Sequence, residues 1–306
     1  MHYKVVTYKG EPAHILESGD LNLLVTDYGA KIQSIRFRGK EMLCQSFNQT
    51  DRYRRSGYAA HFEDGEFSGF DHLFPNISAA PYPDDPWKDI IMPDHGEVWT
   101  QQWKPKYTGN SLIFRVNGVR LPYRFCVTMA LENNDLKLTY EAENLSPYPM
   151  KYLFCCHPLF ILEDGMKLDL PDCSRIINTA PGQKFLGGYL EEHHWPISNE
   201  GRDMSILSSD YRCCNKYYVR NDRPRNDAHL RYPDGTVISM IPEGDGLPYM
   251  GVWTDEFGYG QYAMRCAAPE PASAALDSYS PADEYGMNSI LEPESIKSWT
   301  VRISFR

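Results

Sequence analysis

The stretch YRFCVTMALENNDLKLTYEA, residues 123–142, decides how this chain is expected to fold. Residues 123–131 and 136–142 are rich in β-branched and aromatic side chains, and residues 132–135 supply turn-forming side chains between them. Two such runs joined by a short polar turn are typical of an antiparallel hairpin. This hairpin predicts an antiparallel sheet that other strands can extend.

Further runs of strand-like composition flank this hairpin on both sides. They are residues 21–27, 31–37, 98–100, 111–116, 151–160, 236–241, 250–254 and 299–305. No stretch keeps apolar residues at helical spacing over several turns, and no internal repeat is evident. We therefore predict an all-β fold, a sandwich of large antiparallel sheets in a single domain that spans residues 1–306.

Two segments lack a clear strand pattern. Residues 45–92 are rich in Gly, Pro, Asp and aromatic side chains. Their aromatic content argues against disorder, so we expect either a binding rim or an ordered cover over a sheet edge. Residues 163–230 include Gly182 and the charged run 220–227, which favour long connections.

Composition limits the class of partner. The chain is 42% hydrophobic and 24% charged, as in an ordinary globular protein, and its net charge is -10. This charge disfavours nucleic acids and anionic membrane surfaces, and it is compatible with a neutral substrate. No targeting segment or bilayer-spanning run is visible, so we expect a cytoplasmic protein. Its 8 cysteines form no CxxC pair, which favours reduced, buried thiols.

Three ionisable side chains lie in apolar or conformationally restricted settings. His95, in the stretch PDHGEVW, could face a ligand or lie in a surface turn. His157 lies in an apolar run and precedes a proline, and it could be a core histidine or a general acid. Glu270, between two prolines, could be a solvated carboxylate or a general base. Two imidazoles and a carboxylate are sufficient for acid–base chemistry on a neutral polyol.

A metal site is the weaker interpretation of these side chains. His95 and Glu97 could share one strand face, but no further histidine follows them closely. The adjacent His193 and His194 would point to opposite faces of a strand. No serine elbow, phosphate loop or dinucleotide fingerprint is present. We therefore expect neither a metal ion nor a cofactor.

Several short motifs, taken in order, resemble the aldose 1-epimerase (galactose mutarotase-like) superfamily over nearly the whole chain. They are residues 27–35 (DYGAKIQSI), 69–76 (GFDHLFPN), 94–99 (DHGEVW), 157–160 (HPLF), 270–271 (EP), 291–294 (LEPE) and Trp299. The resemblance implies a galactose-mutarotase-like β-supersandwich with a sugar cleft on one sheet. It also implies a monomer or homodimer that acts on a small sugar without cofactor, metal, nucleic acid or membrane.

The same resemblance implies the roles of individual residues. Glu270 would be the general base on the anomeric hydroxyl, His157 the general acid on the ring oxygen, and His95 a partner that polarises this oxygen. The sugar ring would open to the aldehyde and close again to give the other anomer. Expected contacts to the sugar are Asp71, His72, Asn76, Trp253 and Arg265.

One departure from the family pattern bears on the substrate. Many members carry an arginine shortly after the Phe-Pro or Asn segment, and the corresponding stretch here, residues 74–80, reads FPNISAA without an arginine. Arg54, Arg55 or Arg265 could substitute for it. The missing arginine weakens any assignment to galactose or glucose, and a sugar phosphate would need a cationic site. Two alternatives stay open: a non-catalytic carbohydrate-binding or sensing protein on this scaffold, and a sugar-active enzyme of another reaction class.

Overall fold

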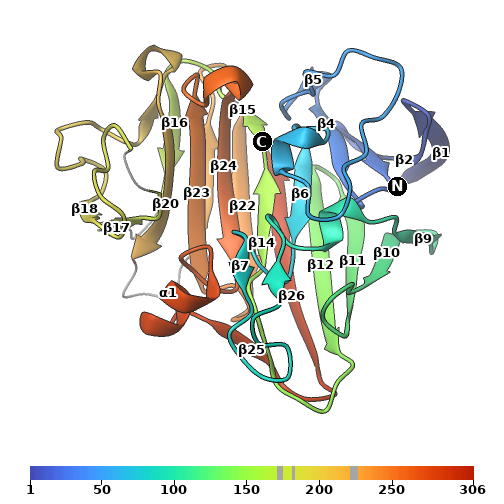
Figure 1. The fold of residues 1–306 in the computed structure, drawn as a ribbon. Helices are drawn as coiled ribbons and strands as arrows, with labels where there is room; N and C mark the ends of the chain where they lie inside the picture. Colours follow the sequence, from blue (N-terminus) through green and yellow to red (C-terminus); the bar gives the residue numbers. More distant parts are fainter. Residues whose placement is uncertain (171–174, 181–182, 221–226) are drawn as a thin grey trace.

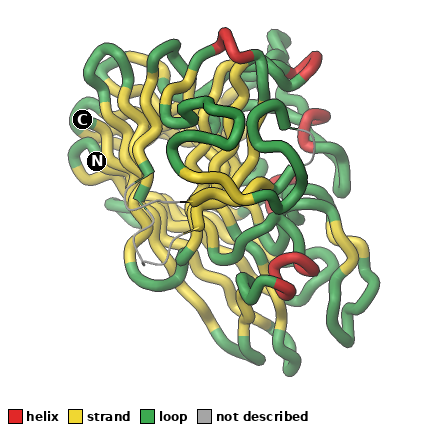
Figure 2. The backbone as a smooth tube through the Cα atoms, turned by 90° about the vertical axis from the view of Figure 1, so that its left-hand side faces the viewer, coloured by secondary structure: helices red, strands yellow, loops and turns green. Residues whose placement is uncertain are grey.

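The structure, a computed structural model, describes residues 1–170, 175–180, 183–220 and 227–306. Within these ranges nearly every regular element is a β-strand (Figure 1), and the one α-helix is α1 (Tyr279–Glu284). Single 3₁₀ turns occur at η1 (Phe62–Asp64), η2 (Val98–Thr100), η3 (Ser209–Tyr211) and η4 (Gly260–Tyr262). Figure 2 shows the helical turns at the margins of the strands. The predicted all-β class is confirmed.

The larger sheet contains 13 strands in the described residues. Its main path runs through β1 (His2–Tyr8), β2 (Glu11–Ser18), β3 (Leu21–Thr26), β4 (Ile32–Phe37), β6 (Phe70–Leu73), β14 (Cys155–Pro158), β24 (Arg265–Ala272), β23 (Tyr249–Glu256), β20 (Cys214–Arg220), β17 (Arg175–Asn178) and β18 (Glu192–His194). Two short strands, β5 (Lys40–Glu41) and β15 (Phe160–Ile161), pair with β4 and β24. The pairings are antiparallel, as predicted.

The second sheet contains 9 strands in the same part of the chain. Their order is β19 (Ile206–Leu207), β16 (Met166–Asp169), β21 (Ala228–Arg231), β22 (Val237–Glu243), β26 (Ile296–Phe305), β12 (Asp135–Asn144), β11 (Tyr123–Glu132), β10 (Leu112–Asn117) and β9 (Lys104–Tyr107). Two small ribbons pair β13 (Met150–Tyr152) with β25 (Ser289–Leu291) and β7 (Ala80–Pro81) with β8 (Ile91–Met92). Among the described residues, no helix has the length and apolar character needed to span a bilayer.

The hairpin of β11 and β12 lies in this second sheet and supplies much of the core. Alternate residues of β12 are buried, because successive side chains of a strand point to opposite faces. The Tyr140 ring lies 4.6 Å from Phe154, which precedes β14 of the larger sheet, and 6.2 Å from Trp299 of β26. One apolar core therefore joins the two sheets, and each fully buried large side chain stabilises it by roughly 1.5–3 kcal/mol.

The single strand predicted for residues 151–160 is wrong, because this segment forms three short strands, β13, β14 and β15, with breaks between them. It pairs with β25 up to Tyr152, and the Leu153 amide then donates to the Pro75 carbonyl at 2.7 Å. The chain enters the larger sheet at β14, where Pro158 has no N–H to donate. β14 pairs with β6 and, at Cys155, with β24, and β15 continues the pairing with β24 in the same register.

The two segments without a strand pattern contain strands that the sequence did not indicate. Residues 45–92 include β6, which is buried on both faces between β4 and β14 and is too short to show alternation. Residues 163–230 include β20, an inner strand beside β23. Gly182 and residues 221–226 of the expected connections lie outside the described residues. The seven described cysteines are free, and all except Cys214 are buried, as expected.

The strand predicted at residues 98–100 is a 3₁₀ turn, because the preceding Glu97 turns into the interior. Its carboxylate has no exposed surface and accepts hydrogen bonds from the Val119 and Arg120 amides at 3.0 and 2.8 Å. The Tyr123 and Tyr58 hydroxyls donate to it at 3.0 and 2.8 Å. Through these hydrogen bonds Glu97 connects residue 58, residues 118–120 and the turn at residues 98–100. Glu97 is therefore not a candidate metal ligand.

Replacing Glu97 tests this role. Glu97→Ala leaves four donors without their acceptor, and each buried donor left unpaired costs about 1–3 kcal/mol, so we expect the free energy of unfolding to fall by at least ~3 kcal/mol. Glu97→Gln should cost less because its amide oxygen still accepts. Urea denaturation measures both changes. Glu143→Ala, which breaks the surface pair with Arg124, should cost under ~1 kcal/mol. Equal costs for Glu97→Ala and Glu143→Ala would contradict this role.

Candidate active site

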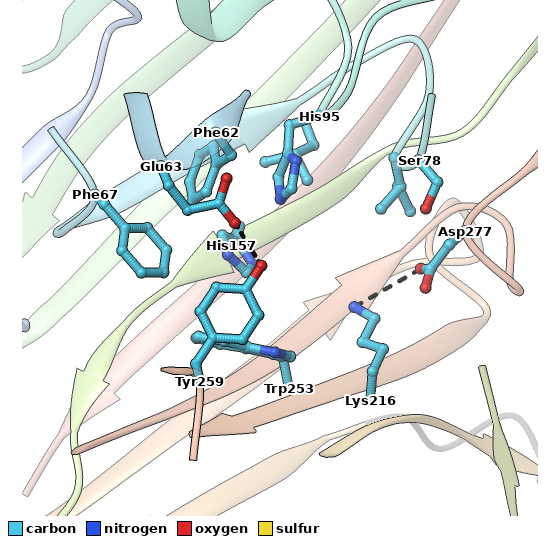
Figure 3. A pocket seen from close by; sticks show the side chains of 12 residues that line it. Phe62, Glu63, Phe67, Ser78, His95, His157, Lys216, Trp253, Tyr259 and Asp277 are labelled. Carbon is cyan, nitrogen blue, oxygen red and sulfur yellow. Dashed lines mark hydrogen bonds and ion pairs between the residues drawn. The ribbon is translucent and has the colours of Figure 1, made fainter. Parts of the chain in front are cut away.

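A pocket opens on the face of the larger sheet that points away from the shared core (Figure 3). Strands β14, β20 and β23 form its floor, and residues from η1, the His95 turn and the chain after β24 form its walls. The lining side chains are Phe62, Glu63, Phe67, Leu73, Ile77, Ser78, His95, His157, Lys216, Trp253, Tyr259 and Asp277.

The buried carboxylate of Glu270 joins two residues of the pocket floor. Glu270 Oε1 lies 2.8 Å from His157 Nδ1, and Glu270 Oε2 accepts a hydrogen bond from Lys216 Nζ. Glu270 has no exposed surface and does not line the pocket itself. Because Glu270 holds His157 through Nδ1, Nε2 is the ring nitrogen that is left to meet a ligand.

The cross-strand neighbour of Glu270 is a glycine for steric reasons. Gly251 on β23 lies opposite Glu270 on β24. A Cβ atom at Gly251 would lie 3.2 Å from Glu270 Oε2 and 3.0 Å from Tyr218 Cε1. These contacts are tight enough to move the carboxylate or the ring. A side chain at this position would therefore disturb the link between His157 and Lys216.

Burial and charge interactions together set the protonation states of Glu270, His157 and Lys216. Burial disfavours the charged form of Glu270, but Lys216 and His157 outweigh it and lower the pKa of this carboxyl group to about 2. Burial also lowers the pKa of His157 below 6.5, against the opposing effect of Glu270. Burial disfavours the ammonium of Lys216 as well, but Asp277 and Glu270 raise its pKa. At neutral pH the site therefore holds an ionised Glu270, a neutral His157 and a charged Lys216.

His95 reaches the pocket through a tight turn with left-handed backbone. His95 has a φ of 60° and Gly96 a φ of 76°. A Cβ atom at Gly96 would lie 2.3 Å from the Phe74 carbonyl oxygen, so only glycine fits there. The His95 amide donates to the Ile77 carbonyl at 2.6 Å, and the Asn76 side chain donates to the Pro93 carbonyl at 2.6 Å. These bonds fix the turn against residues 74–77.

The two histidines of the pocket are arranged alike. His95 Nδ1 lies 2.8 Å from Asp94 Oδ2, as His157 Nδ1 does from Glu270. The two imidazole centroids are 5.5 Å apart, and the Phe62 ring stacks on His95 at 4.0 Å. Each ring is therefore held by a carboxylate at Nδ1, which leaves Nε2 of both rings for a ligand.

An aromatic wall faces the histidines. Trp253 lies 5.8 Å from His157 between ring centroids, and Phe67 and Tyr259 pack beside it. The Tyr259 hydroxyl donates to Glu63 of η1, so the wall is joined to the segment before β6. Phe62, Glu63 and Phe67 all come from residues 45–92. This segment thus supplies part of the pocket rim that the sequence left undecided.

The residues expected to contact the sugar do not all face the pocket. Trp253 lines the pocket. Asp71 is cross-strand to His157, but its carboxylate is buried against Lys31 Nζ at 2.5 Å. His72, the next residue on β6, points into the core, where Nδ1 lies 2.9 Å from the Tyr140 hydroxyl. Asp71 and His72 could not both face a ligand, because adjacent residues of a strand point to opposite faces.

The remaining expected contacts lie away from the pocket lining. Asn76 is fully buried and supports the His95 turn. Arg265, at the start of β24, pairs with Asp164 at 2.9 Å. Of the other arginines considered, Arg55 pairs with Glu11, and Arg54 does not line this pocket. The basic residue that lines the pocket is Lys216.

Sequence reasoning missed Lys216 and Asp277. Lys216 lies in the stretch CNKYYVR, residues 214–220, and the aromatic and β-branched side chains of this stretch are a strand signal. The signal lies within a segment for which long connections were expected. Asp277 follows β24 in a turn, and no local pattern indicates its position. In the described part of the chain, no group of three or more His, Cys, Asp or Glu residues could hold a metal ion.

Solved structures match this architecture over nearly the full chain. A galactose mutarotase-like protein from Lactobacillus casei ATCC 334 has 16% identity and a TM-score of 0.71, with 96% of this chain and 100% of that chain covered. A galactose mutarotase related enzyme from Lactobacillus acidophilus has 18% identity and a TM-score of 0.70, with 96% and 97% covered. A galactose mutarotase-like protein from Clostridium acetobutylicum has 14% identity and a TM-score of 0.69, with 100% and 98% covered.

The chain has the galactose mutarotase-like fold. This result confirms the β-supersandwich expected from the sequence. No family model and no curated protein matches the sequence. Because the structural matches have low sequence identity, they establish the fold of the chain and leave its activity to the site.

Titration of His157 tests the electrostatics of the pocket. We expect its NMR titration midpoint to lie below 6.5, because burial disfavours the imidazolium. Glu270→Gln should lower this midpoint further, since the carboxylate is the group that favours the charged ring. The His157→Gln variant identifies the signal by its loss. A midpoint above 6.5, or one that rises in Glu270→Gln, would show that these charges are wrongly assigned.

Proposed function

We propose that this protein is an aldose 1-epimerase-like enzyme that interconverts the α and β anomers of a free sugar. The observation that carries the proposal is the pair of imidazoles, His95 and His157, which face one pocket with ring centroids 5.5 Å apart. Ring opening of a sugar hemiacetal needs a base at the anomeric hydroxyl and an acid at the ring oxygen. Two nearby imidazoles can supply both functions near neutral pH.

The geometry favours a division of the proton transfers that differs from the one the resemblance implies. Glu270 is fully buried and both of its oxygens are occupied, so it would act through His157 as a positioning residue. Neutral His157, with its Nδ1 proton donated to Glu270, presents an unprotonated Nε2 that can accept a proton. His157 would therefore be the base, and His95, held by Asp94, would be the acid.

The reaction then balances within the pocket. His157 Nε2 takes the proton of the anomeric hydroxyl while the bond between the anomeric carbon and the ring oxygen breaks. The ring oxygen receives a proton from His95 Nε2, and the sugar becomes an open-chain aldehyde. After the aldehyde carbon turns about its bond to the neighbouring carbon, the ring closes with both transfers reversed. The protein returns to its starting state, and the product is the other anomer.

The electrostatics of the pocket bear on the substrate. Lys216 is paired with Glu270 and Asp277, and Glu63 adds a further carboxylate at the rim. The pocket lining therefore offers no surplus positive charge to a phosphate group. The aromatic wall can pack against the apolar face of a sugar ring. Both features support a neutral sugar as substrate.

Anomer exchange tests the proposal directly. Freshly dissolved single anomers of a panel of aldoses, followed by polarimetry or NMR, should reach equilibrium faster with the protein than without it. His157→Ala should reduce this acceleration about 10²–10⁴-fold, because one proton-transfer partner is lost. His194→Ala, which removes an exposed histidine on β18, is the matched control and should retain full activity. Sugar binding without accelerated exchange would favour the carbohydrate-binding alternative.

A further inference from the structure

Two charged residues of the pocket take no part in the proposed proton transfers. The Lys216 and Asp277 side chains are only 13% and 12% exposed, and both line the pocket (Figure 3). The Tyr218 hydroxyl donates to Asp277 Oδ1 at 2.7 Å, and the Thr179 hydroxyl donates to Oδ2 at 3.2 Å. These contacts fix the carboxylate beside the lysine, so the pair is built into the fold.

The backbone that presents Asp277 is strained. Leu276 and Asp277 are consecutive and have φ values of 75° and 60°. This left-handed region is unfavourable for side chains other than glycine, and a bulky leucine is an outlier there. The Asp277 carbonyl accepts a hydrogen bond from the Ser78 amide at 2.8 Å, which anchors the turn to the pocket wall. Such strain is concentrated at functional sites, where the surrounding structure maintains it.

The Lys216 ammonium and the Asp277 carboxylate both line the pocket and keep hydrogen-bonding capacity for a ligand that approaches from it. Lys216 Nζ lies 3.7 Å from Asp277 Oδ1, which is beyond hydrogen-bonding distance. An ammonium group has three donors, and within the described residues the hydrogen bond it makes is the one to Glu270. One hydroxyl group of a sugar can accept from Lys216 while the hydroxyl on the neighbouring carbon donates to Asp277. The pair is thus complementary to two adjacent hydroxyl groups, one that accepts and one that donates.

We propose that Lys216 and Asp277 form a subsite that holds two adjacent hydroxyl groups, a vicinal diol, of a neutral sugar. The inference rests on the proposed function, because it takes the pocket to be a sugar site. Lys216 is already balanced by Glu270 and Asp277, so the subsite favours a diol over a phosphate or carboxylate group.

This subsite also fixes the orientation of the sugar. Glu270 lies between Lys216 and His157, so a diol bound at Lys216 lies at a distance from the reacting carbon at His157. Trp253 is the cross-strand neighbour of Lys216 and lies beside His157, where it can support the ring face between the two ends. The anomeric carbon and the diol are thus expected at opposite ends of one sugar.

The test combines sugar analogues with protein variants. For an aldose that binds, we compare the parent with analogues that each lack one hydroxyl, and we measure dissociation constants by calorimetry and anomer exchange by NMR. In the unmodified protein, loss of either hydroxyl of one adjacent pair should weaken binding about 10- to 100-fold, since both meet charged partners. In Lys216→Met and Asp277→Asn, binding of the parent sugar should weaken by a similar factor. The analogues that lack either hydroxyl of this pair should then bind no more weakly than the parent sugar.

The Lys216→Met variant needs a control that shows that it is folded and that the loss of the ammonium affects the neighbouring charged groups. Removal of the ammonium should raise the pKa of His157, because Lys216 is one of the groups that lower it. Lys216→Arg keeps the charge and should retain part of the discrimination. Lys184→Met, which removes an exposed lysine outside the pocket, should match the unmodified protein.

The outcomes separate this inference from the proposed function. Diol discrimination without accelerated exchange supports the subsite and overturns the epimerase. Accelerated exchange in which both variants keep the original discrimination supports the epimerase and overturns the subsite. Equal weakening of every analogue in both variants also overturns the subsite, because the residues would then act only on the position of Glu270. If no sugar binds or exchanges, both proposals fail.

Discussion

The ionised carboxylate of Glu270 is the constraint on which the pocket depends. A buried carboxylate that lacks partners costs several kcal/mol in lost hydration, so Glu270 requires both Lys216 and His157 as donors. These requirements fix three strands against one another, since the partners lie on β20, β14 and β24. The position of Lys216, the tautomer of His157 and the need for glycine at position 251 all follow from this one interaction.

The second histidine is positioned by an independent set of contacts. His95 does not lie on the sheet, and its turn is held by a glycine, by Asn76 and by stacking with Phe62. Glu97 then connects this turn to Tyr123 of β11, to the Val119 and Arg120 amides before that strand, and to Tyr58. The two imidazoles are therefore positioned by a sheet and by a turn that is held through hydrogen bonds and stacking.

Local sequence patterns predicted the long strands and failed where tertiary contacts dominate. The hairpin of β11 and β12 was identified because its alternation and turn residues are local properties. β6 was missed because a four-residue strand buried on both faces shows no alternation. The turn at residues 98–100 was assigned as a strand because its conformation follows from the buried carboxylate of Glu97, whose partners are distant in sequence.

The sequence by itself determined the all-β class and the aromatic character of residues 45–92, and it indicated His95, His157 and Glu270 as candidates, because these inferences depend on composition, spacing and ordered motifs. Only the tertiary structure decided which polar residues face the pocket. Asp71 and His72 are neighbours that point to opposite faces, whereas Lys216 and Asp277 meet from positions 61 residues apart in the chain. Side-chain direction and long-range pairing are set by strand register and by burial, which short motifs do not encode.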